Sequence, residues 1–231
     1  MATTAMQLPA PRHGDRAQPI LSRRMLADGG AVALVTRDDP DARILTEEER
    51  RASLAGFMAS RPAGNVWVFV YGSLIWNPAI ETVERRVAAV EGWHRTFCLS
   101  MPTGRGTPAR PGLALGLDGG GTCLGVAYRL AERDVASERE VLWRREMLLG
   151  GYRPEWVELI GGDGTVFGHG VAFVIDAPHQ HYAGEIPLRA TIQRLATVEG
   201  LRSHGIEDTE LERVGALVEA AMLLAFWREA A

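Results

Sequence analysis

Five consecutive apolar residues end abruptly in a turn within the stretch VWVFVYGSLIWNP, residues 66–78. A short run so rich in Val, Trp and Phe predicts a buried strand. The Tyr-Gly-Ser sequence at Tyr71, Gly72 and Ser73 then predicts a backbone bend, because glycine tolerates positive φ and lets another group approach the main chain. Such a bend is either a plain turn or a place built to hold a ligand.

Strand patterns continue from this point to about residue 130. They are VAAVEGWHRTFCLS at 87–100, GLALGLD at 112–118 and TCLGVAYRL at 122–130. The last two flank three glycines, 119–121, and are predicted to form a hairpin. The glycines lie between strands and no helix follows them, so they do not match a dinucleotide-binding loop. Two later strands are predicted at WVELI, 156–160, and VFGHGVAFVID, 166–176.

Helices are predicted on both sides of these strands. The segment 44–60 has Thr46 as N-cap and Glu49 as its capping-box partner, and the segment 137–151 has a similar Ser137 and Glu140 pair. The tail from about 188 has helical periodicity. Strands in the middle of the chain with helices inserted and appended predict an α+β fold around a small sheet or barrel.

The length of 231 residues is that of one domain. Residues 1–43 mix Pro, Arg, Asp and Gly with one short apolar patch, so we expect an irregular N-terminal arm. Residues 44–231 are expected to form the domain. Because the arm lacks a core pattern, its removal is expected to change activity by no more than a few-fold.

Composition excludes several classes of function. All 25 basic Lys or Arg positions are arginine, which excludes a P-loop, a pyridoxal Schiff base and a protein kinase, since each requires a lysine. With a net charge of −4 and arginines spread among acids, nucleic acid is not an expected partner. No apolar run is long enough to span a membrane and none resembles a secretory signal. Two cysteines outside any C-x-x-C pair fit a reducing compartment, so a cytoplasmic location is expected.

Glu146 is the first candidate for chemistry. Together with Leu142 and Leu149 it is spaced to lie in the middle of an apolar helix face. Burial disfavours a charged carboxylate and raises its pKa, which suits a general base or acid. The structural alternative is a buried ion pair with Arg144, Arg145 or a loop arginine.

Other candidates are weaker. His179 and His181 could face one metal ion, but no third ligand stands at a diagnostic spacing, so no metal site is predicted. Ser73 lies in YGSLI, which lacks the G-x-S-x-G pattern of a serine hydrolase. Tyr128 and Tyr152, taken singly, are typical of core or rim positions.

Several motifs in order carry a family resemblance: WVFVYGSLIWNP, GWHRTFCLS, RGTPARPGLALGLD, GVAYRL, LWRREMLLGGY and HQHYAGEIPL. This order resembles the ChaC-type glutathione-specific γ-glutamylcyclotransferases over about residues 44–190. The resemblance implies a γ-glutamylcyclotransferase-like mixed β-barrel with flanking helices and a reaction without cofactor. The substrate would be glutathione, whose α-amino group attacks its own γ-carbonyl to release 5-oxoproline and Cys-Gly.

The resemblance also implies site residues. The loop FVYGSL would hold the γ-glutamyl end through Phe69, Val70, Tyr71, Gly72, Ser73 and Leu74, and Glu146 would accept the proton. The chain differs from the family in having Val70 where Gly is usual, and in lacking a Gly-rich stretch ending in Asn-x-x-Tyr near residue 200. Two alternatives therefore stand beside glutathione: cyclisation of another γ-glutamyl amine, and γ-glutamyl binding without turnover.

Overall fold

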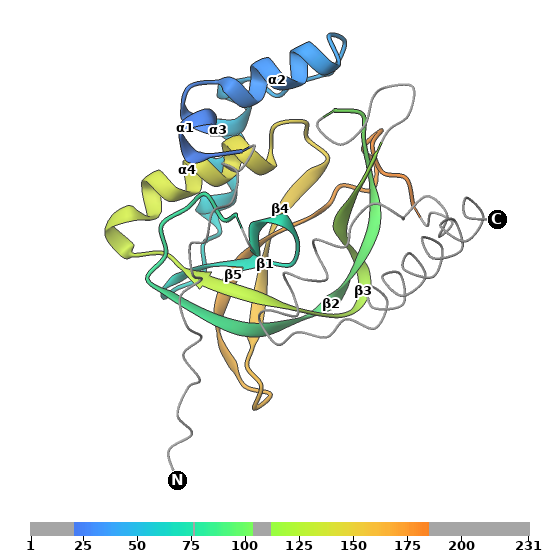
Figure 1. Ribbon diagram of the computed structural model, residues 1–231. Coiled ribbons are helices and arrows are strands. Elements are labelled where there is room, and N and C mark those ends of the chain that lie inside the picture. Colours follow the sequence, from blue (N-terminus) through green and yellow to red (C-terminus); the bar gives the residue numbers. More distant parts are fainter. Residues whose placement is uncertain (1–20, 76, 104–111, 185–231) are drawn as a thin grey trace, which may run out of the picture.

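A computed structural model describes residues 21–75, 77–103 and 112–184. Its centre is a closed five-stranded barrel in the order β1-β3-β2-β4-β5 (Figure 1). β1 runs parallel to β5, and the other neighbouring strands are antiparallel. The strands are β1 Val66–Val70, β2 Glu84–Met101, β3 Gly112–Arg129, β4 Tyr152–Ile160 and β5 Val166–Ile175. The expected α+β fold with a mixed barrel is confirmed.

β1 is buried at every residue and is paired with a strand on each side. Val68 is opposite Tyr128 of β3 on one side and opposite Val171 of β5 on the other. The apolar run in the sequence is therefore a buried strand, as predicted, and the next residue, Tyr71, is buried as well.

β2 and β3 form one long bent ribbon, and the predicted hairpin at residues 119–121 is wrong. β3 continues through these glycines while staying paired with β2. The pairing shifts register at this point, and Gly92, Gly120 and Gly121 all have positive φ. Glycine adopts these angles without a steric penalty, so the residues form an irregular bend in the ladder rather than a turn.

Because of this bend, the first half of β3 lies near the start of β4 and the end of β5. There the Tyr152 hydroxyl of β4 donates a hydrogen bond of 2.8 Å to the Leu115 carbonyl oxygen. A Cβ placed on Gly116 would lie 3.4 Å from Ile175 of β5. Leu115 consequently reaches the end of β1, although 44 positions separate it from Tyr71.

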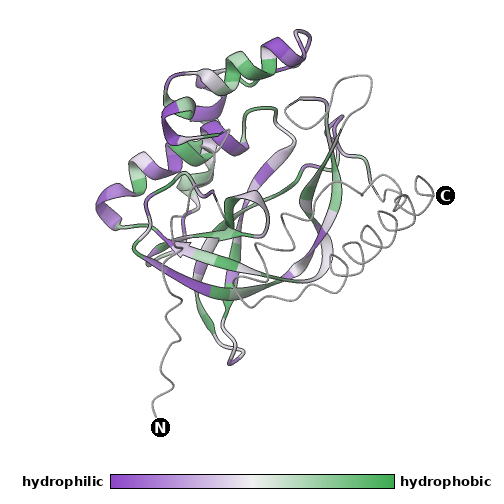
Figure 2. Ribbon diagram, in the orientation of Figure 1, coloured by the Kyte–Doolittle hydropathy of each residue, from purple (hydrophilic) through white to green (hydrophobic). Residues whose placement is uncertain are grey.

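The helices gather on one side of the barrel (Figure 1). They are α1 Arg23–Ala27, α2 Gly30–Asp38, α3 Glu47–Ala59 and α4 Val135–Glu146, with short 3₁₀ turns at Ser73–Ile75 and Glu132–Asp134. The helices carry both hydrophilic and hydrophobic stretches, as expected of elements with one face on the core (Figure 2). Among the described residues, no helix is both long and apolar enough to cross a membrane.

Two predicted helix starts have different outcomes. The capping box of Thr46 and Glu49 is confirmed at the start of α3. That of Ser137 is wrong: α4 begins at Val135, and the Ser137 hydroxyl donates to the Asp134 carbonyl oxygen instead. α4 also ends at Glu146 rather than at residue 151.

The expectation of an irregular arm over residues 1–43 is wrong for residues 23–38, which form α1 and α2. The apolar patch that the sequence shows there buries Ala31 and Val35, and Leu26 of α1 is buried as well. A domain boundary at residue 43 stays a prediction. The predicted C-terminal helices lie outside the described residues.

Candidate active site

β1 ends in a tight turn that several hydrogen bonds hold in place. The Ile75 N–H donates to the Gly72 carbonyl oxygen at 2.9 Å, which closes the 3₁₀ turn. The Tyr71 hydroxyl donates to the Phe173 carbonyl oxygen of β5 at 2.6 Å, and the Tyr128 hydroxyl to the Ile75 carbonyl oxygen at 2.9 Å. These bonds from neighbouring strands make the turn a rigid part of the barrel.

Gly72 does not need the left-handed backbone angles that the sequence suggested. It is absent from the glycines with positive φ. A Cβ at this position would lie 3.9 Å from the Leu115 side chain, an ordinary contact distance. Gly72 therefore leaves space in front of the main chain and has a φ outside the left-handed region.

That space is part of a small cavity with a volume of about 50 Å³. Its walls come from the end of β1, from the returning half of β3, and from residues of α4, β4 and β5. The lining residues are Phe69, Tyr71, Gly72, Ser73, Leu74, Ala114, Leu115, Glu146, Tyr152 and Phe173. The structure thus brings all but one of the predicted site residues to one cavity.

Val70 is the exception. It is fully buried in β1 and is not among the residues that line the cavity. Successive side chains of a strand point to opposite faces, so Val70 faces away from the side that Phe69 and Tyr71 share. The difference from the usual family residue at this position therefore adds no side chain to the cavity wall.

Glu146 is the last residue of α4 and lies at the cavity edge. It does not occupy the middle of an apolar helix face as expected, because the helix ends before Leu149. Its side chain is 13% exposed, and its Oε1 lies 2.9 Å from Nε of Arg145, whose side chain is 3% exposed. The ion pair considered as an alternative is present, and the same carboxylate also lines the cavity.

Arg145 links this carboxylate to the turn after β1. Its Nη2 donates to the Ser73 hydroxyl oxygen at 3.2 Å, and its Nη1 donates to the Asn77 carbonyl oxygen. A planar guanidinium with several donors can hold such partners in a fixed arrangement. The position of Glu146 relative to the turn is therefore set by one buried side chain.

The cavity also contains two tyrosines. Burial raises the pKa of the Tyr71 hydroxyl well above its usual value of 10.0, and the nearby Tyr152 and Glu146 raise it further. Tyr71 is thus a neutral phenol at physiological pH. Tyr152 donates a hydrogen bond to the Leu115 carbonyl oxygen and also lines the cavity.

The sequence did not reveal four of the lining residues: Ala114, Leu115, Tyr152 and Phe173. Tyr152 ends the LWRREMLLGGY motif, but taken singly it is typical of a core or rim position. The other three are ordinary strand residues, and only the bend of β3 and the pairing of β5 bring them here. No local pattern distinguishes them.

His179 and His181 lie close together after the end of β5. Their ring centroids are 4.9 Å apart in an edge-to-face arrangement, and the His181 N–H donates to Nδ1 of His179. Burial lowers the pKa of His181, and the charge of His179 lowers it further. Among the described residues, no group of three or more His, Cys, Asp or Glu side chains could hold a metal ion.

Solved structures share this fold. The crystal structure of the yeast γ-glutamyl cyclotransferase specific to glutathione matches with a TM-score of 0.55 and 20% sequence identity, covering 68% of this chain and 99% of that one. At this identity the likeness shows the fold alone. The chain therefore has the mixed barrel of a γ-glutamylcyclotransferase-like protein, with a carboxylate at the end of β1.

Sequence comparison establishes the family. Residues 66–215 match the family described as ChaC-like protein, and because this is more than half of the chain, the chain belongs to that family. The chain is 43% identical over 154 residues to the glutathione-specific γ-glutamylcyclotransferase of Escherichia coli. It is 30% identical over 145 residues to glutathione-specific γ-glutamylcyclotransferase 1 of Homo sapiens.

These matches cover 66% and 62% of this chain, respectively. They span 66% of the Escherichia coli protein and 65% of the human protein, just under two thirds of each relative.

Proposed function

We propose that this protein converts glutathione into 5-oxoproline and Cys-Gly by intramolecular cyclisation, with Glu146 as general base and acid. The observation that carries the proposal is that the Glu146 carboxylate lines the same small cavity as the turn from Tyr71 to Leu74. Two relatives named as glutathione-specific cyclotransferases support the choice of substrate.

The reaction moves protons from the attacking nitrogen to the leaving nitrogen and needs no external reagent. Glu146 takes a proton from the α-ammonium group of the γ-glutamyl residue, whose reference pKa is about 8. The free amine then attacks the γ-carbonyl carbon, and a five-membered ring closes. The ring nitrogen gives up a second proton as the lactam forms, the bond from the γ-carbon to the cysteinyl nitrogen breaks, and Glu146 passes a proton to the leaving amine. The two protons lost by the attacking nitrogen are thus the two that the amino group of Cys-Gly gains. Such proton transfer typically contributes about 10² to 10⁴ in rate.

The turn after β1 offers main-chain N–H groups to the negative charges of the substrate carboxylate and of the developing oxyanion. The N–H groups of Ser73 and Leu74 precede the first hydrogen bond of the 3₁₀ turn, which Ile75 donates. N–H groups at such a turn can receive a carboxylate or a developing oxyanion. Arg145 adds positive charge beside the Glu146 carboxylate and close to this turn.

A cytoplasmic location also belongs to this proposal. Cys98 and Cys123 are buried free thiols, and burial raises the pKa of Cys98 to about 12. Two free cysteines fit a reducing compartment, where glutathione is abundant as a thiol.

We expect no cofactor, because the substrate supplies both the nucleophile and the electrophile.

The test is incubation of the purified protein with glutathione, with 5-oxoproline and Cys-Gly measured by mass spectrometry. We expect both products in equal amounts. Release of 5-oxoproline from γ-glutamyl-alanine but not from glutathione would instead assign another γ-glutamyl amine. Saturable glutathione binding without either product would assign a binding protein and overturn the proposed reaction.

A further inference from the structure

A second cavity lies outside the site described above, between the N-terminal helices α1 and α2 and the helices α3 and α4. Its volume is about 220 Å³. It shares no lining residue with the cavity at Glu146. Leu26, Ala31, Val32 and Leu148 form apolar walls, and charged side chains from α3 and α4 form the remainder.

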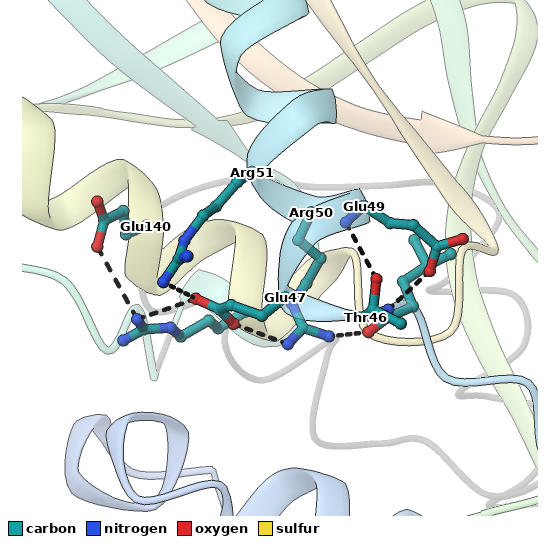
Figure 3. A network of polar contacts seen from close by, with 8 residues as sticks. Thr46, Glu47, Glu49, Arg50, Arg51 and Glu140 are labelled. Atoms are coloured by element: carbon teal, nitrogen blue, oxygen red, sulfur yellow. Dashed lines mark hydrogen bonds and ion pairs between the residues drawn. The ribbon is translucent and has the colours of Figure 1, made fainter.

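The side chains that line this cavity carry a net positive charge. Arg50, Arg51 and Arg144 line it, and all three guanidinium groups share the Glu47 carboxylate. The nitrogen to oxygen distances are 2.9, 3.4 and 3.2 Å, respectively. Figure 3 shows Arg50 and Arg51 converging on Glu47.

The Glu47 carboxylate is ionised in this setting, because the hydrogen bond from Arg50 and that from Arg144 lower its pKa. Three positive charges therefore face one negative charge within the wall. Glu140 lies 3.9 Å from Arg144 but is not among the lining residues, and more than half of its side chain is exposed.

Arg50, which lines the cavity, has one hydrogen-bond donor without a partner in the described part of the chain, while its other two nitrogens donate to the Leu45 carbonyl oxygen and to Glu47. Its side chain is only 9% exposed, yet its Nε has no hydrogen-bond partner among the described residues. A buried donor without a partner costs free energy unless a ligand or water satisfies it. A guanidinium presents its donors in a planar fork that matches carboxylate oxygens.

The start of α2 contributes to the same cavity. Gly29, the N-cap of this nine-residue helix, and Ala31 and Val32 of its first turn are lining residues. Gly29 provides no side-chain cap, so no side chain of the N-cap blocks the first N–H groups. Helix N-termini favour anions because these N–H groups and the helix dipole point outward.

We propose that this cavity, which we call the α2–α3 cavity, binds a small organic carboxylate distinct from the substrate at Glu146. The carboxylate would lie among Arg50, Arg51 and the start of α2. The apolar walls favour a short aliphatic or alicyclic body over a fully hydrated inorganic anion.

The experiment is a titration of the ¹⁵N-labelled full chain with isobutyrate, followed by NMR. Parallel titrations use isobutyramide, a neutral analogue of the same shape, and inorganic phosphate. We expect saturable shifts of the Arg50 Nε–H signal and of the Gly29–Val32 amides with isobutyrate. Isobutyramide should leave them unchanged, and phosphate should bind more weakly.

Three variants locate the binding. Arg51→Met removes one charge from a side chain that is 72% exposed, and Val32→Phe fills the cavity without changing charge. Each should weaken isobutyrate binding by about tenfold or more while leaving glutathione turnover unchanged. Arg24→Met, at a 91% exposed arginine of α1 that does not line the cavity, should bind like the native protein.

Absence of saturable shifts with isobutyrate would overturn the proposal. Binding that persists unchanged in both Arg51→Met and Val32→Phe would place the ligand elsewhere and overturn it as well. Phosphate binding tighter than isobutyrate would contradict the assignment to an organic carboxylate. Because cyclotransferase activity is measured separately, failure here leaves the proposed function standing.

Discussion

At the scale of single residues, Glu146 is both part of a buried ion pair and a lining residue of the cavity. From the sequence alone, an ion pair and a catalytic carboxylate were alternatives. Its carboxylate lines the cavity and is paired with the buried guanidinium of Arg145. Arg145 in turn donates to Ser73 and to the Asn77 carbonyl oxygen of the chain after β1. A change at Glu146 is therefore expected to affect catalysis and stability together.

Replacing Glu146 by Gln tests this directly. Without a proton acceptor, kcat should fall by about 10² or more. Breaking a buried pair should also destabilise the fold by about 3 to 5 kcal/mol, since the charge of Arg145 loses its counterion. Kinetics below the melting transition, together with a melting curve, separate the two effects.

Glu140→Gln is the matched control on the same helix, because Glu140 is largely exposed and lies outside the cavity. It should keep native kinetics. A Glu146→Gln protein that melts early yet turns over at nearly the native rate would show that Glu146 is only structural.

Gly72 gives a second prediction at this scale. A valine there would project its methyl groups toward Leu115 and into the cavity, where a Cβ alone is already at contact distance. We expect Gly72→Val to raise KM at least about tenfold while the protein stays folded, because the φ of Gly72 is not in the left-handed region.

Gly72→Ala should have a much smaller effect on KM, since the added methyl makes only ordinary contacts. The measurement is steady-state kinetics with glutathione for both variants, with circular dichroism as the check on folding. Unchanged KM in Gly72→Val would mean that the substrate does not approach this part of the turn.

At the scale of elements, α4 is held at both ends. Near its start, the Glu138 carboxylate accepts from Arg23 of α1 in a bidentate pair at 2.5 and 2.7 Å, and from the Glu81 N–H at 2.9 Å. At its other end, Arg145 and Glu146 hold it to the turn after β1. This arrangement aligns the helix that carries the proposed base.

The Glu138 pair predicts a pH dependence of stability. Burial alone would raise the pKa of Glu138, but the hydrogen bonds from Arg23 and the Glu81 N–H outweigh it and lower the pKa below its usual value. The stabilisation is therefore fully present above the pKa of an unfolded glutamate, about 4.3. It is lost as the pH falls from there through the lower folded pKa.

Glu138→Gln should lower the free energy of unfolding by about 2 kcal/mol at pH 7. This lies between the stabilisation typical of exposed ion pairs and that of buried ones, because Glu138 is buried while the Arg23 side chain is 43% exposed. This corresponds to a fall in Tm of about 4 to 8 °C. The difference in Tm from the native protein should shrink below about pH 4. A difference that stays constant down to pH 2 would contradict the depressed pKa of Glu138.

At the scale of the whole molecule, α1 and α2 are part of the packed structure. Leu26, Ala31 and Val35 are buried, and Arg23 is bound to α4. No residue of α1 or α2 lines the cavity at Glu146. We therefore expect α1 and α2 to contribute to stability and not to the proposed reaction.

Deletion of residues 1–43 should lower Tm by more than the single change Arg23→Gln, because it also removes Leu26 and Ala31 from the hydrophobic core. Turnover measured below the transition should stay within a few-fold of the native value. Equal Tm values for the deletion and the full chain would show that α1 and α2 add no stability. Loss of all turnover in a folded deletion would assign them a role at the site.

Metal removal is a further test on the whole protein. Prolonged treatment with a chelator should leave glutathione turnover unchanged, since the proposed reaction uses only side chains, main-chain N–H groups and the substrate. Inactivation that added zinc reverses would revive the pair His179 and His181 as ligands.

Local patterns determined part of this structure. The apolar run before Tyr71 predicted the buried strand β1, Thr46 with Glu49 predicted the start of α3, and the family motifs singled out Glu146 and the turn after β1. These features depend on residues close together in the chain, where burial patterns and capping chemistry are encoded directly. The order of motifs also determined the fold class.

Only the tertiary structure decided how the cavity closes. The register shift at Gly92, Gly120 and Gly121 turns what looked like a hairpin into a bent ribbon, and that ribbon brings Leu115 to the end of β1. The packing of α1 against α4 was hidden in the same way, because Arg23 and Glu138 are 115 positions apart. Contacts between distant segments depend on how the strands pair and bend, and no local pattern records that.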